Sequence, residues 1–257
     1  MDPLLDFTDH SIIVTGAASG FGALLAEMLD QRGANLVLGD LNQDGLEKTS
    51  EKLMSSAITL VGDVADESYA QSLVKAALDN YGKLDIAVNN AGIAPPQLKS
   101  LAELDIDVLE KQLNVNTRGV ALGLKYQLAA MAEKQSGAIL NVSSMAGVSG
   151  APMIGSYAAA KHAVVGLTKT AAVEFGKMNL RVNAICPFFA ATPMVDNPIL
   201  NPTDNLEDVN QRLAAGSPMK RIGTVEEMVN VMLMMISPHN TFMSGQAIHV
   251  DGAMSAW

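Results

Sequence analysis

Seven short runs of apolar and β-branched residues alternate with longer segments of helical spacing, and this rhythm constrains the fold most strongly. The runs are SIIVTG (11–16), ANLVLGD (34–40), ITLVGD (58–63), LDIAVNNAG (84–92), GAILNVSS (137–144), LRVNAICP (180–187) and QAIHVDG (246–252). Short strands separated by segments long enough for a crossover helix are typical of a parallel sheet with helices on both faces. We therefore predict an α/β fold with one doubly wound, parallel, seven-stranded sheet.

Nearly every run ends in small or polar residues, and this end of a doubly wound sheet is where ligands bind. The least regular region, 187–216, is rich in Pro, Asn and Leu and follows the sixth run. A loop this long inside a compact domain is usually functional, so we expect a substrate lid there. No linker or repeat interrupts the chain, so we expect one domain over 1–257.

Composition excludes several classes of partner. The chain has 17 basic and 27 acidic side chains, a formal charge of −10, which opposes binding to nucleic acid or anionic membranes. The start lacks the features of a secretory signal, and the apolar stretches are too short to span a membrane. Cys186 is the only cysteine, which excludes an intrachain disulfide. We expect a cytoplasmic protein in which Cys186 is a buried, inert thiol.

A glycine-rich loop joins the first predicted strand to an amphipathic helix. In TGAASGFG (15–22), Gly16, Gly20 and Gly22 allow a tight turn and a close approach of the backbone to a pyrophosphate. The helix N-terminus that follows offers free N–H donors and the positive end of its dipole. This pattern favours a Rossmann-type dinucleotide site over a purely structural turn.

An acidic residue ends the second predicted strand. Asp40 lies 40 − 16 = 24 residues beyond the first glycine, near the spacing of a carboxylate that accepts hydrogen bonds from the adenosine ribose. It would repel a 2′-phosphate, and no Arg or Lys occurs in 15–22 or 39–43 to bind one. The pattern favours NAD over NADP, although Asp40 could instead be a turn residue. Asp63 and Asn90 end the next two strands, where adenine and its ribose are expected.

The stretch YAAAK places a tyrosine and a lysine on one helix face. Tyr157 and Lys161 are four residues apart, so their side chains point the same way. Taken alone, the pair is more simply a packing tyrosine beside a lysine with a solvated amine.

Several motifs in a fixed order change that interpretation. TGAASGFG, GDV (62–64), NNAG (89–92), VNTRG (115–119), NVSS (141–144), YAAAK (157–161) and VDG (250–252) resemble those of the classical short-chain dehydrogenase/reductase (SDR) family. The resemblance covers essentially the whole chain. It implies hydride transfer between a nicotinamide and a substrate carbon, for which no metal is needed; the four histidines show no ligand spacing.

The resemblance implies four catalytic residues. Tyr157 would be the acid/base, with its pKa lowered by the charges of Lys161 and the oxidised nicotinamide. Lys161 would also hold the nicotinamide ribose. Ser144 would bind the substrate oxygen, with Ser143 as its rival. Asn116 would bend the central helix and anchor a water of a proton relay, with Asn114 as its rival.

The cofactor and substrate residues follow from the same motifs. We assign cofactor binding to Gly16, Ser19, Gly20, Phe21, Gly22, Asp40, Leu41, Asp63, Val64, Asn90, Ala91, Gly92, Tyr157, Lys161, Pro187 and Thr192. We assign substrate binding to Ser144, Met145, Met153, Tyr157, Phe189 and Met194. The pocket positions are almost all apolar, which favours a cyclic, aromatic or steroid-like secondary alcohol or its ketone.

Two further features bear on the assembly and on the site. Where the family commonly has Pro-Gly, this chain has Pro187 followed by Phe188, which leaves the local loop path open. Phe188 and Phe189 either line the substrate pocket or pack under the lid. The Met-rich segment 226–237 has helical apolar spacing, and it belongs either to the core or to a subunit interface. The resemblance favours the interface and hence a homotetramer. The sequence assigns no role to Trp257.

Two other functions compete with an NAD-dependent dehydrogenase. A non-catalytic dinucleotide sensor would be expected to lose the tyrosine or the lysine, and both are present. A 3-oxoacyl thioester reductase is disfavoured by Asp40 and by a lid without clustered basic residues.

Overall fold

The computed structural model describes residues 2–195 and 211–256, and its centre is the predicted parallel sheet. All seven strands pair in parallel in the order β3-β2-β1-β4-β5-β6-β7. The chain order reverses between β1 and β4, which makes the carboxyl edge there a ligand-binding position. The strands are β1 (Ser11–Thr15), β2 (Asn35–Asp40), β3 (Ile58–Val61), β4 (Ile86–Asn89), β5 (Gly137–Val142), β6 (Leu180–Pro187) and β7 (Ala247–Val250).

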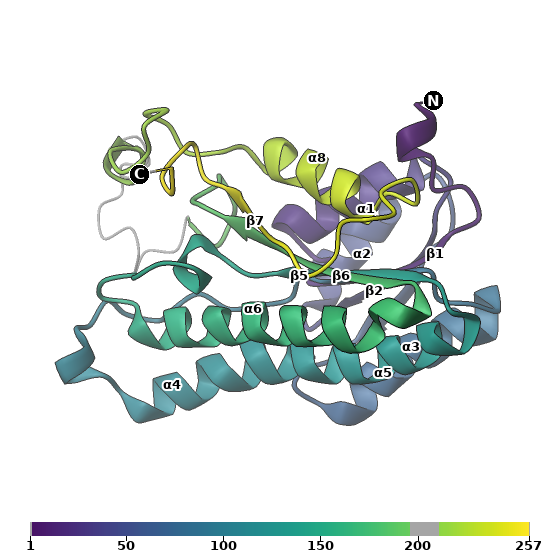
Figure 1. The fold of residues 1–257 in the computed structure, drawn as a ribbon, viewed down its shortest axis with the longest axis horizontal. Coiled ribbons are helices and arrows are strands. Elements are labelled where there is room, and N and C mark those ends of the chain that lie inside the picture. Colours follow the sequence, from purple (N-terminus) through teal and green to yellow (C-terminus); the bar gives the residue numbers. More distant parts are fainter. Residues whose placement is uncertain (1, 196–210, 257) are drawn as a thin grey trace.

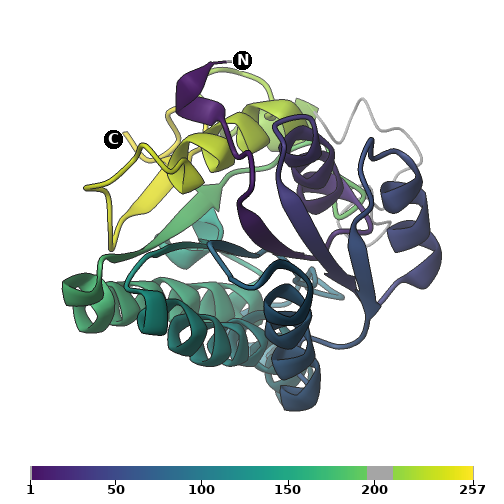
Figure 2. The ribbon, with the colours of Figure 1, turned by 90° about the vertical axis from the view of Figure 1, so that its right-hand side faces the viewer.

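Helices cover both faces of the sheet, as predicted (Figures 1 and 2). Helices α1 (Gly20–Asp30), α2 (Gln43–Glu51) and α8 (Val225–Ile236) pack on one face. The other face carries α3 (Glu67–Tyr81), α5 (Gly119–Lys134) and α6 (Gly155–Phe175), and α4 (Ile106–Leu113) packs beside α6. Side-chain caps fix where several helices begin: Asn42 and Asp66 accept from Gly45 and Ser68 N–H groups, and Thr224 forms a capping box with Glu227.

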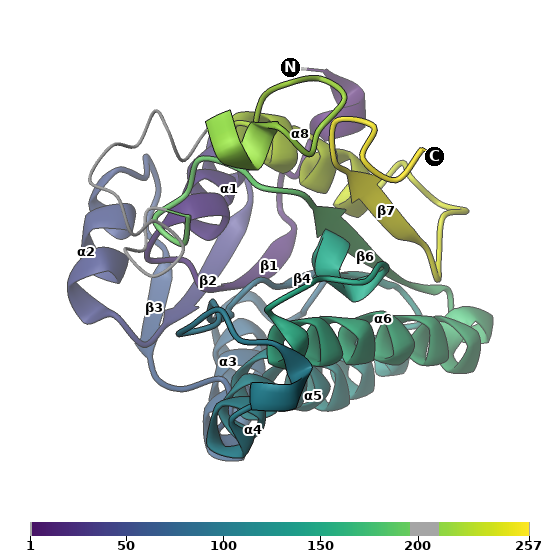
Figure 3. The same cartoon turned by 90° about the vertical axis from the view of Figure 1, so that its left-hand side faces the viewer.

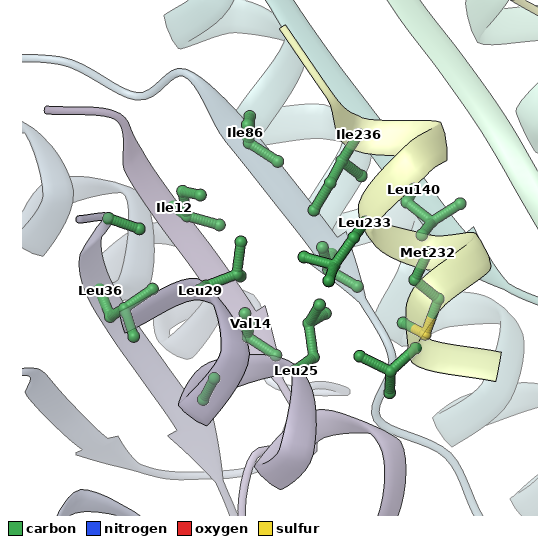
Figure 4. Close-up of a cluster of buried hydrophobic side chains, with 14 of the residues drawn as sticks. Ile12, Val14, Leu25, Leu29, Leu36, Ile86, Leu140, Met232, Leu233 and Ile236 are labelled. Atoms are coloured by element: carbon green, nitrogen blue, oxygen red, sulfur yellow. The ribbon is translucent and has the colours of Figure 1, made fainter. Parts of the chain in front are cut away.

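Successive strand residues point to opposite faces and build two cores. Ile12 and Val14 of β1 join the core beneath α1 and α8, while Ile13 between them joins the core on the other face. Because both faces are covered, the central strands are continuous apolar runs, the pattern that made them recognisable in the sequence. Figure 4 shows Val14 among Leu25 and Leu233 from the two covering helices.

Most strands end earlier than the apolar runs that predicted them. β4 stops at Asn89 although its run continues to residue 92, and β5 stops at Val142 before the two serines. The small and polar residues beyond these ends form the loops of the carboxyl edge. The sheet therefore delivers their functional groups to one side of the molecule.

The Met-rich segment forms α8, and it belongs mainly to the core. Met232 and Met235 are buried in the core with α1 and the sheet, Met228 is also buried, and Met234 is half exposed. Unbranched methionine side chains fill the irregular space between α8 and α1. The homotetramer stays a prediction.

Two sequence expectations concern segments outside this framework. The described parts of the expected lid, 187–195 and 211–216, flank the cavity described below; its remainder, 196–210, lies outside the described residues. Across the described chain, no helix combines the length and the apolar character that a membrane span needs.

Candidate active site

A cavity of about 1000 Å³ follows the carboxyl edge of the sheet. Its lining extends from Asp63, after β3, to Met254, after β7, and so reaches from one end of the sheet to the other. Single-ligand pockets usually measure about 300 to 1000 Å³, so this cavity is large enough for a dinucleotide and a small substrate side by side.

The glycine loop at the centre of this edge is held by β4. Gly16 has φ +68°, and a Cβ there would lie 2.7 Å from Asn90 Nδ2 and 2.8 Å from Ala91 Cα. Asn90 donates from Nδ2 to the carbonyl oxygens of Thr15 (3.0 Å) and Gly16 (3.1 Å). Gly22 packs behind the loop, because a Cβ on it would overlap the Gly16 carbonyl oxygen at 2.1 Å. Asn90 thus positions the loop, and Gly22 does not line the cavity.

The N-terminus of α1 opens into the cavity with the features that a pyrophosphate needs. Ser19, Gly20 and Phe21 line the cavity, the Ser19 side chain makes no capping hydrogen bond, and the first turn contains no acidic residue. The N–H groups of a helix's first turn have no acceptor within the helix. Gly20 has φ +54°, and a Cβ there would lie 3.6 Å from Thr192 Cγ2 across the loop. These residues fit the pyrophosphate of a dinucleotide at the N-terminus of α1, and Thr192 lies close against Gly20.

The adenosine end carries fixed carboxylates. Asp40 accepts hydrogen bonds from the Ala18 and Asn42 N–H groups, both at 2.9 Å, so its carboxylate is held at the cavity wall. Asp63 accepts from the Ala65 N–H at 2.9 Å. Leu41 and Val64 complete this wall, and none of the described lining residues from the ends of β1, β2 and β3 is basic.

Tyr157 and Lys161 lie on one face of α6, as the spacing predicted. The Lys161 amine is buried and donates to the carbonyl oxygen of Val142 at 2.8 Å, which ties α6 to the end of β5. Its nitrogen lies 5.7 Å from the centre of the Tyr157 ring. Both residues line the cavity.

The electrostatics of this pair differ from the sequence expectation. Burial raises the pKa of Tyr157, and the hydrogen bond with Ser144 only partly offsets this effect. Burial also lowers the pKa of Lys161 to about 8. The amine lies over the tyrosine ring and against a carbonyl, so its charge does not overcome the desolvation of the phenol. The phenol of the protein alone is therefore protonated at neutral pH.

The two serines after β5 have different surroundings. Ser143 is buried and donates from Oγ to the Lys161 carbonyl oxygen at 2.9 Å. Ser144 acts on the Tyr157 phenol by lowering its pKa, and its Oγ accepts from the Ala146 N–H at 3.1 Å. Both serines line the cavity, and the choice of Ser144 over Ser143 stays a prediction.

Asn114 and Asn116, near the end of α4, differ in their burial. A π-helical segment, Asn114–Arg118, joins α4 to α5, and within it Asn116 is fully buried whereas Asn114 is exposed. Asn116 accepts from the Ile93 N–H (2.8 Å) and donates to the Ile93 carbonyl oxygen (3.0 Å) and to Gln112 Oε1 (2.6 Å). Its amide holds the loop after β4 and does not line the cavity, so its part in a relay stays a prediction.

The substrate end of the cavity is apolar. Met145, Phe189 and Met194 line it as expected, but Met153 does not. The backbone of Met153 adopts φ +67° and its carbonyl accepts from the Lys99 N–H at 2.9 Å, while its side chain is 46% exposed. The assignment of Met153 to the substrate pocket is therefore not supported, because the local backbone turn decides the direction of the side chain.

Phe188 lines the cavity, one of the two positions that the sequence left open for it. Phe188 continues the pairing of β6, with its N–H donating to the Val250 carbonyl oxygen at 3.0 Å, and its φ is not positive, so no glycine is required there. Its ring packs on Phe189 edge to face at 4.8 Å. The remaining unassigned lining residues include Leu98, Lys111, Val115, Arg212 and Met254. Met254 follows the seventh strand, and the rule that strand ends form the site could have indicated it.

The lone cysteine lies beneath this site. Cys186 in β6 is fully buried, and burial raises its thiol pKa to about 11. The prediction of a buried thiol is confirmed, and a thiol with this pKa is protonated and unreactive at neutral pH.

A doubly wound sheet with a glycine loop, a helix N-terminus and a Ser–Tyr–Lys cluster at its switch point defines a dinucleotide-dependent enzyme class. Residues 16–255 match a family model described as enoyl-(acyl carrier protein) reductase. Levodione reductase of Leifsonia aquatica is 36% identical over 268 residues, covering 99% of this chain and 97% of the relative. The chain belongs to the short-chain dehydrogenase/reductase family, as its motifs predicted.

One further relative and two solved structures agree with this membership. Cis-4-hydroxycyclohexanecarboxylate dehydrogenase of Sinomonas cyclohexanicum is 37% identical over 253 residues, covering 97% of this chain and 98% of the relative. The crystal structure of levodione reductase superposes with a TM-score of 0.93 at 35% identity, covering 97% and 99% of the two chains. Carveol dehydrogenase of Mycobacterium avium, solved in complex with NAD, gives 0.91 at 26% identity with the same coverages.

The glycine loop generates a stability prediction. Gly16→Ala should lower the free energy of unfolding by about 1 to 2 kcal/mol or more, because an alanine at positive φ is strained and its Cβ would also overlap Asn90 and Ala91. Gly166→Ala, with open space at an exposed position of α6, should instead stabilise by about 0.5 to 1 kcal/mol. Urea unfolding of both variants measures the difference. If both variants changed the free energy of unfolding by the same amount, Gly16 would not be required by the conformation of the glycine loop.

Proposed function

We propose that this protein is an NAD-dependent oxidoreductase that interconverts a hydrophobic, cyclic secondary alcohol and its ketone. The observation that carries the proposal is that Ser144, Tyr157 and Lys161 line the same cavity as the glycine loop, opposite an apolar wall. This constellation supports catalysis over a non-catalytic sensor, since a sensor has no need of a hydroxyl pair beside a buried amine.

NAD fits the nucleotide end and is the cofactor of solved relatives. Gly16 and Gly20 would hold its phosphates, Thr192 would bind the nicotinamide carboxamide, and Asp40 and Asp63 would hold the adenosine. The nicotinamide would supply or accept the hydride. Asp40 supports NAD over NADP, because a fixed carboxylate favours two ribose hydroxyls and repels a phosphate.

The catalytic side chains divide the proton chemistry among them. Tyr157 gives its phenolic proton to the carbonyl oxygen during reduction and, as the phenolate, takes the proton of the alcohol during oxidation. Ser144, hydrogen-bonded to Tyr157, orients the same oxygen. Lys161 provides a nearby positive charge whenever its amine is protonated, and it fixes the helix that carries Tyr157.

The substrate class rests on the cavity wall and on the names of relatives. Met145, Phe189 and Met194 offer apolar contact beside the hydroxyl pair, which suits a saturated ring. Three relatives are named for cyclic substrates: levodione reductase, a cyclohexadienediol dehydrogenase and a hydroxycyclohexanecarboxylate dehydrogenase. A direct test measures the increase in absorbance at 340 nm when the protein is mixed with NAD and a panel of cyclic, aryl and steroid alcohols. The competing class is tested with 3-oxoacyl thioesters and NADH, whose oxidation lowers the same absorbance.

The acid/base assignment predicts a specific loss. Tyr157→Phe should lower kcat for oxidation by at least about 100-fold, because the proton acceptor is removed. The dissociation constant for NAD, measured by fluorescence titration, should change little. Tyr126→Phe removes a hydroxyl that bonds to Glu67 on the surface and should retain activity. Residual activity of Tyr157→Phe near that of the wild type would refute the assignment.

The raised pKa of Tyr157 predicts opposite pH profiles for the two directions. Oxidation needs the phenolate, so its kcat/KM should rise as the pH increases from 6 to 9. Reduction needs the protonated phenol, so its kcat/KM should be flat near neutral pH and fall only in alkaline solution. Steady-state rates in both directions measure the profiles. An oxidation rate that falls between pH 6 and 9 would exclude Tyr157 as the base.

Cofactor preference gives the next prediction. Asp40→Ala should lower the ratio of kcat/KM with NAD to that with NADP by roughly tenfold or more, since hydrogen bonds to a charged group contribute about 1.5 to 3 kcal/mol. Asp44→Ala, in the first turn of α2 and away from the cavity lining, should leave the ratio unchanged. An unchanged ratio in Asp40→Ala would remove Asp40 from cofactor recognition.

A further inference from the structure

The C-terminal turn after β7 reaches the cavity at the end farthest from the adenosine residues. β7 and β3 are the opposite edges of the sheet, and Met254 lies just beyond β7 while Asp63 lies just beyond β3. The glycine loop, Asp40 and Asp63 are contributed by the strands from β1 to β3. Pro187 at the end of β6 and Thr192 beyond it are assigned to the cofactor, so the volume at the β7 end of the cavity is left for the substrate.

Hydrogen bonds hold this turn in one place. Asp251 accepts from the N–H groups of Ala253 and Ser255 at 3.0 and 2.9 Å, which closes the turn. The Gly252 carbonyl oxygen accepts from Ser217 Oγ at 3.1 Å and from the Met219 N–H at 3.3 Å. Figure 3 shows the C-terminal segment beside the loop that precedes α8.

The approach of these two segments is close enough to require a glycine. Gly252 has φ +60°, and a Cβ there would lie 2.4 Å from Ser217 Oγ. Ser217 is itself buried. The turn is therefore part of the folded domain, and the position of Met254 is fixed by it.

Met254 and Phe188 both approach a second glycine. A Cβ on Gly216 would lie 3.6 Å from Phe188 Cζ and 3.7 Å from Met254 Cε, so the two side chain ends lie on the same side of the cavity. Phe188 also packs on Phe189, and all three side chains line the cavity. Together they form an apolar end of the cavity built from the residues after β6 and after β7, in which Met254 is 36% exposed.

We propose that Met254 and Phe188 determine the size of the substituent that the substrate ring can carry. This inference rests on the proposed function, because it names the part of that cavity which selects among cyclic alcohols. A wall of packed apolar side chains excludes groups larger than the space it leaves, and one methylene in such a pocket changes selectivity by about 10- to 200-fold. Shortening either side chain should admit a larger ring substituent.

The test compares two alcohols that differ in bulk. The rates of NAD reduction with cyclohexanol and with 4-tert-butylcyclohexanol give a ratio of kcat/KM, bulky over small, for each enzyme. Met254→Ala and Phe188→Ala should each raise this ratio by about tenfold or more. Met54→Ala shortens an exposed methionine outside the cavity lining and should leave the ratio at the wild-type value. A ratio within twofold of wild type in both cavity variants would overturn the proposal.

Two further measurements keep the result interpretable. Met254→Leu preserves most of the side-chain volume and should keep the kcat/KM ratio near the wild-type value. If Met254→Ala acted only by disturbing the C-terminal turn, Met254→Leu would not restore the ratio. Should Phe188→Ala fail to fold, Phe188→Leu provides the same test with a smaller expected rise of about threefold. If the wild type oxidises no alcohol of the panel, the proposed function fails and the inference with it. If it does and the ratio stays constant, only the inference fails.

Discussion

The buried amine of Lys161 and its hydrogen bond to the Val142 carbonyl oxygen organise the whole site. Burying a charged lysine nitrogen costs free energy unless the nitrogen forms hydrogen bonds. Here the hydrogen bond to the carbonyl oxygen of Val142, the last residue of β5, reduces this cost. The bond fixes α6 against the strand that carries Ser144, so the hydroxyls of Ser144 and Tyr157 are brought together without depending on a mobile loop. Burial of the same nitrogen lowers its pKa, which keeps its charge sensitive to what binds beside it.

A second set of buried polar contacts supports this arrangement from within the domain. Asn89 exchanges hydrogen bonds with Gln127 and donates to Asn141, which in turn donates to Thr168. The chain of amides joins β4, β5, α5 and α6, and every hydrogen bond is made between buried groups. Polar networks of this kind define one arrangement because any displacement leaves a buried group without a partner. They fix the strand ends that present Asn90 and Ser144.

The sequence predicted the fold and most of the site because its strongest signals are local. Continuous apolar runs gave the strands, and the positions of the glycines, Asp40 and the Tyr–Lys pair gave the two ends of the cavity. What it could not give depends on three-dimensional packing. Met153 turns outward because of its backbone φ, the pKa of Tyr157 depends on burial, and Met254 reaches the cavity only because the last strand lies beside β6.

Other sequence expectations concern properties of a different kind. Residues 196–210 of the predicted lid lie outside the described residues, and the homotetramer and the cytoplasmic location stay predictions. Most methionines of the Met-rich helix α8 are buried within the chain's own core, and Met234 is among the side chains exposed on its outer surface.

The π-helical segment between α4 and α5 makes this part of the chain intolerant of changes in length. A π turn is one residue longer than a regular helical turn, and here the extra residue allows Asn116 to reach Ile93 while α5 keeps its own register against the sheet. Loss of one residue from 114–118 would restore regular helix and leave α4 and α5 in nearly the same rotation, but Asn116 would lose the wide turn that lets it reach Ile93. A deletion here should therefore release the loop after β4 from Asn116, even where individual side chains can be exchanged freely.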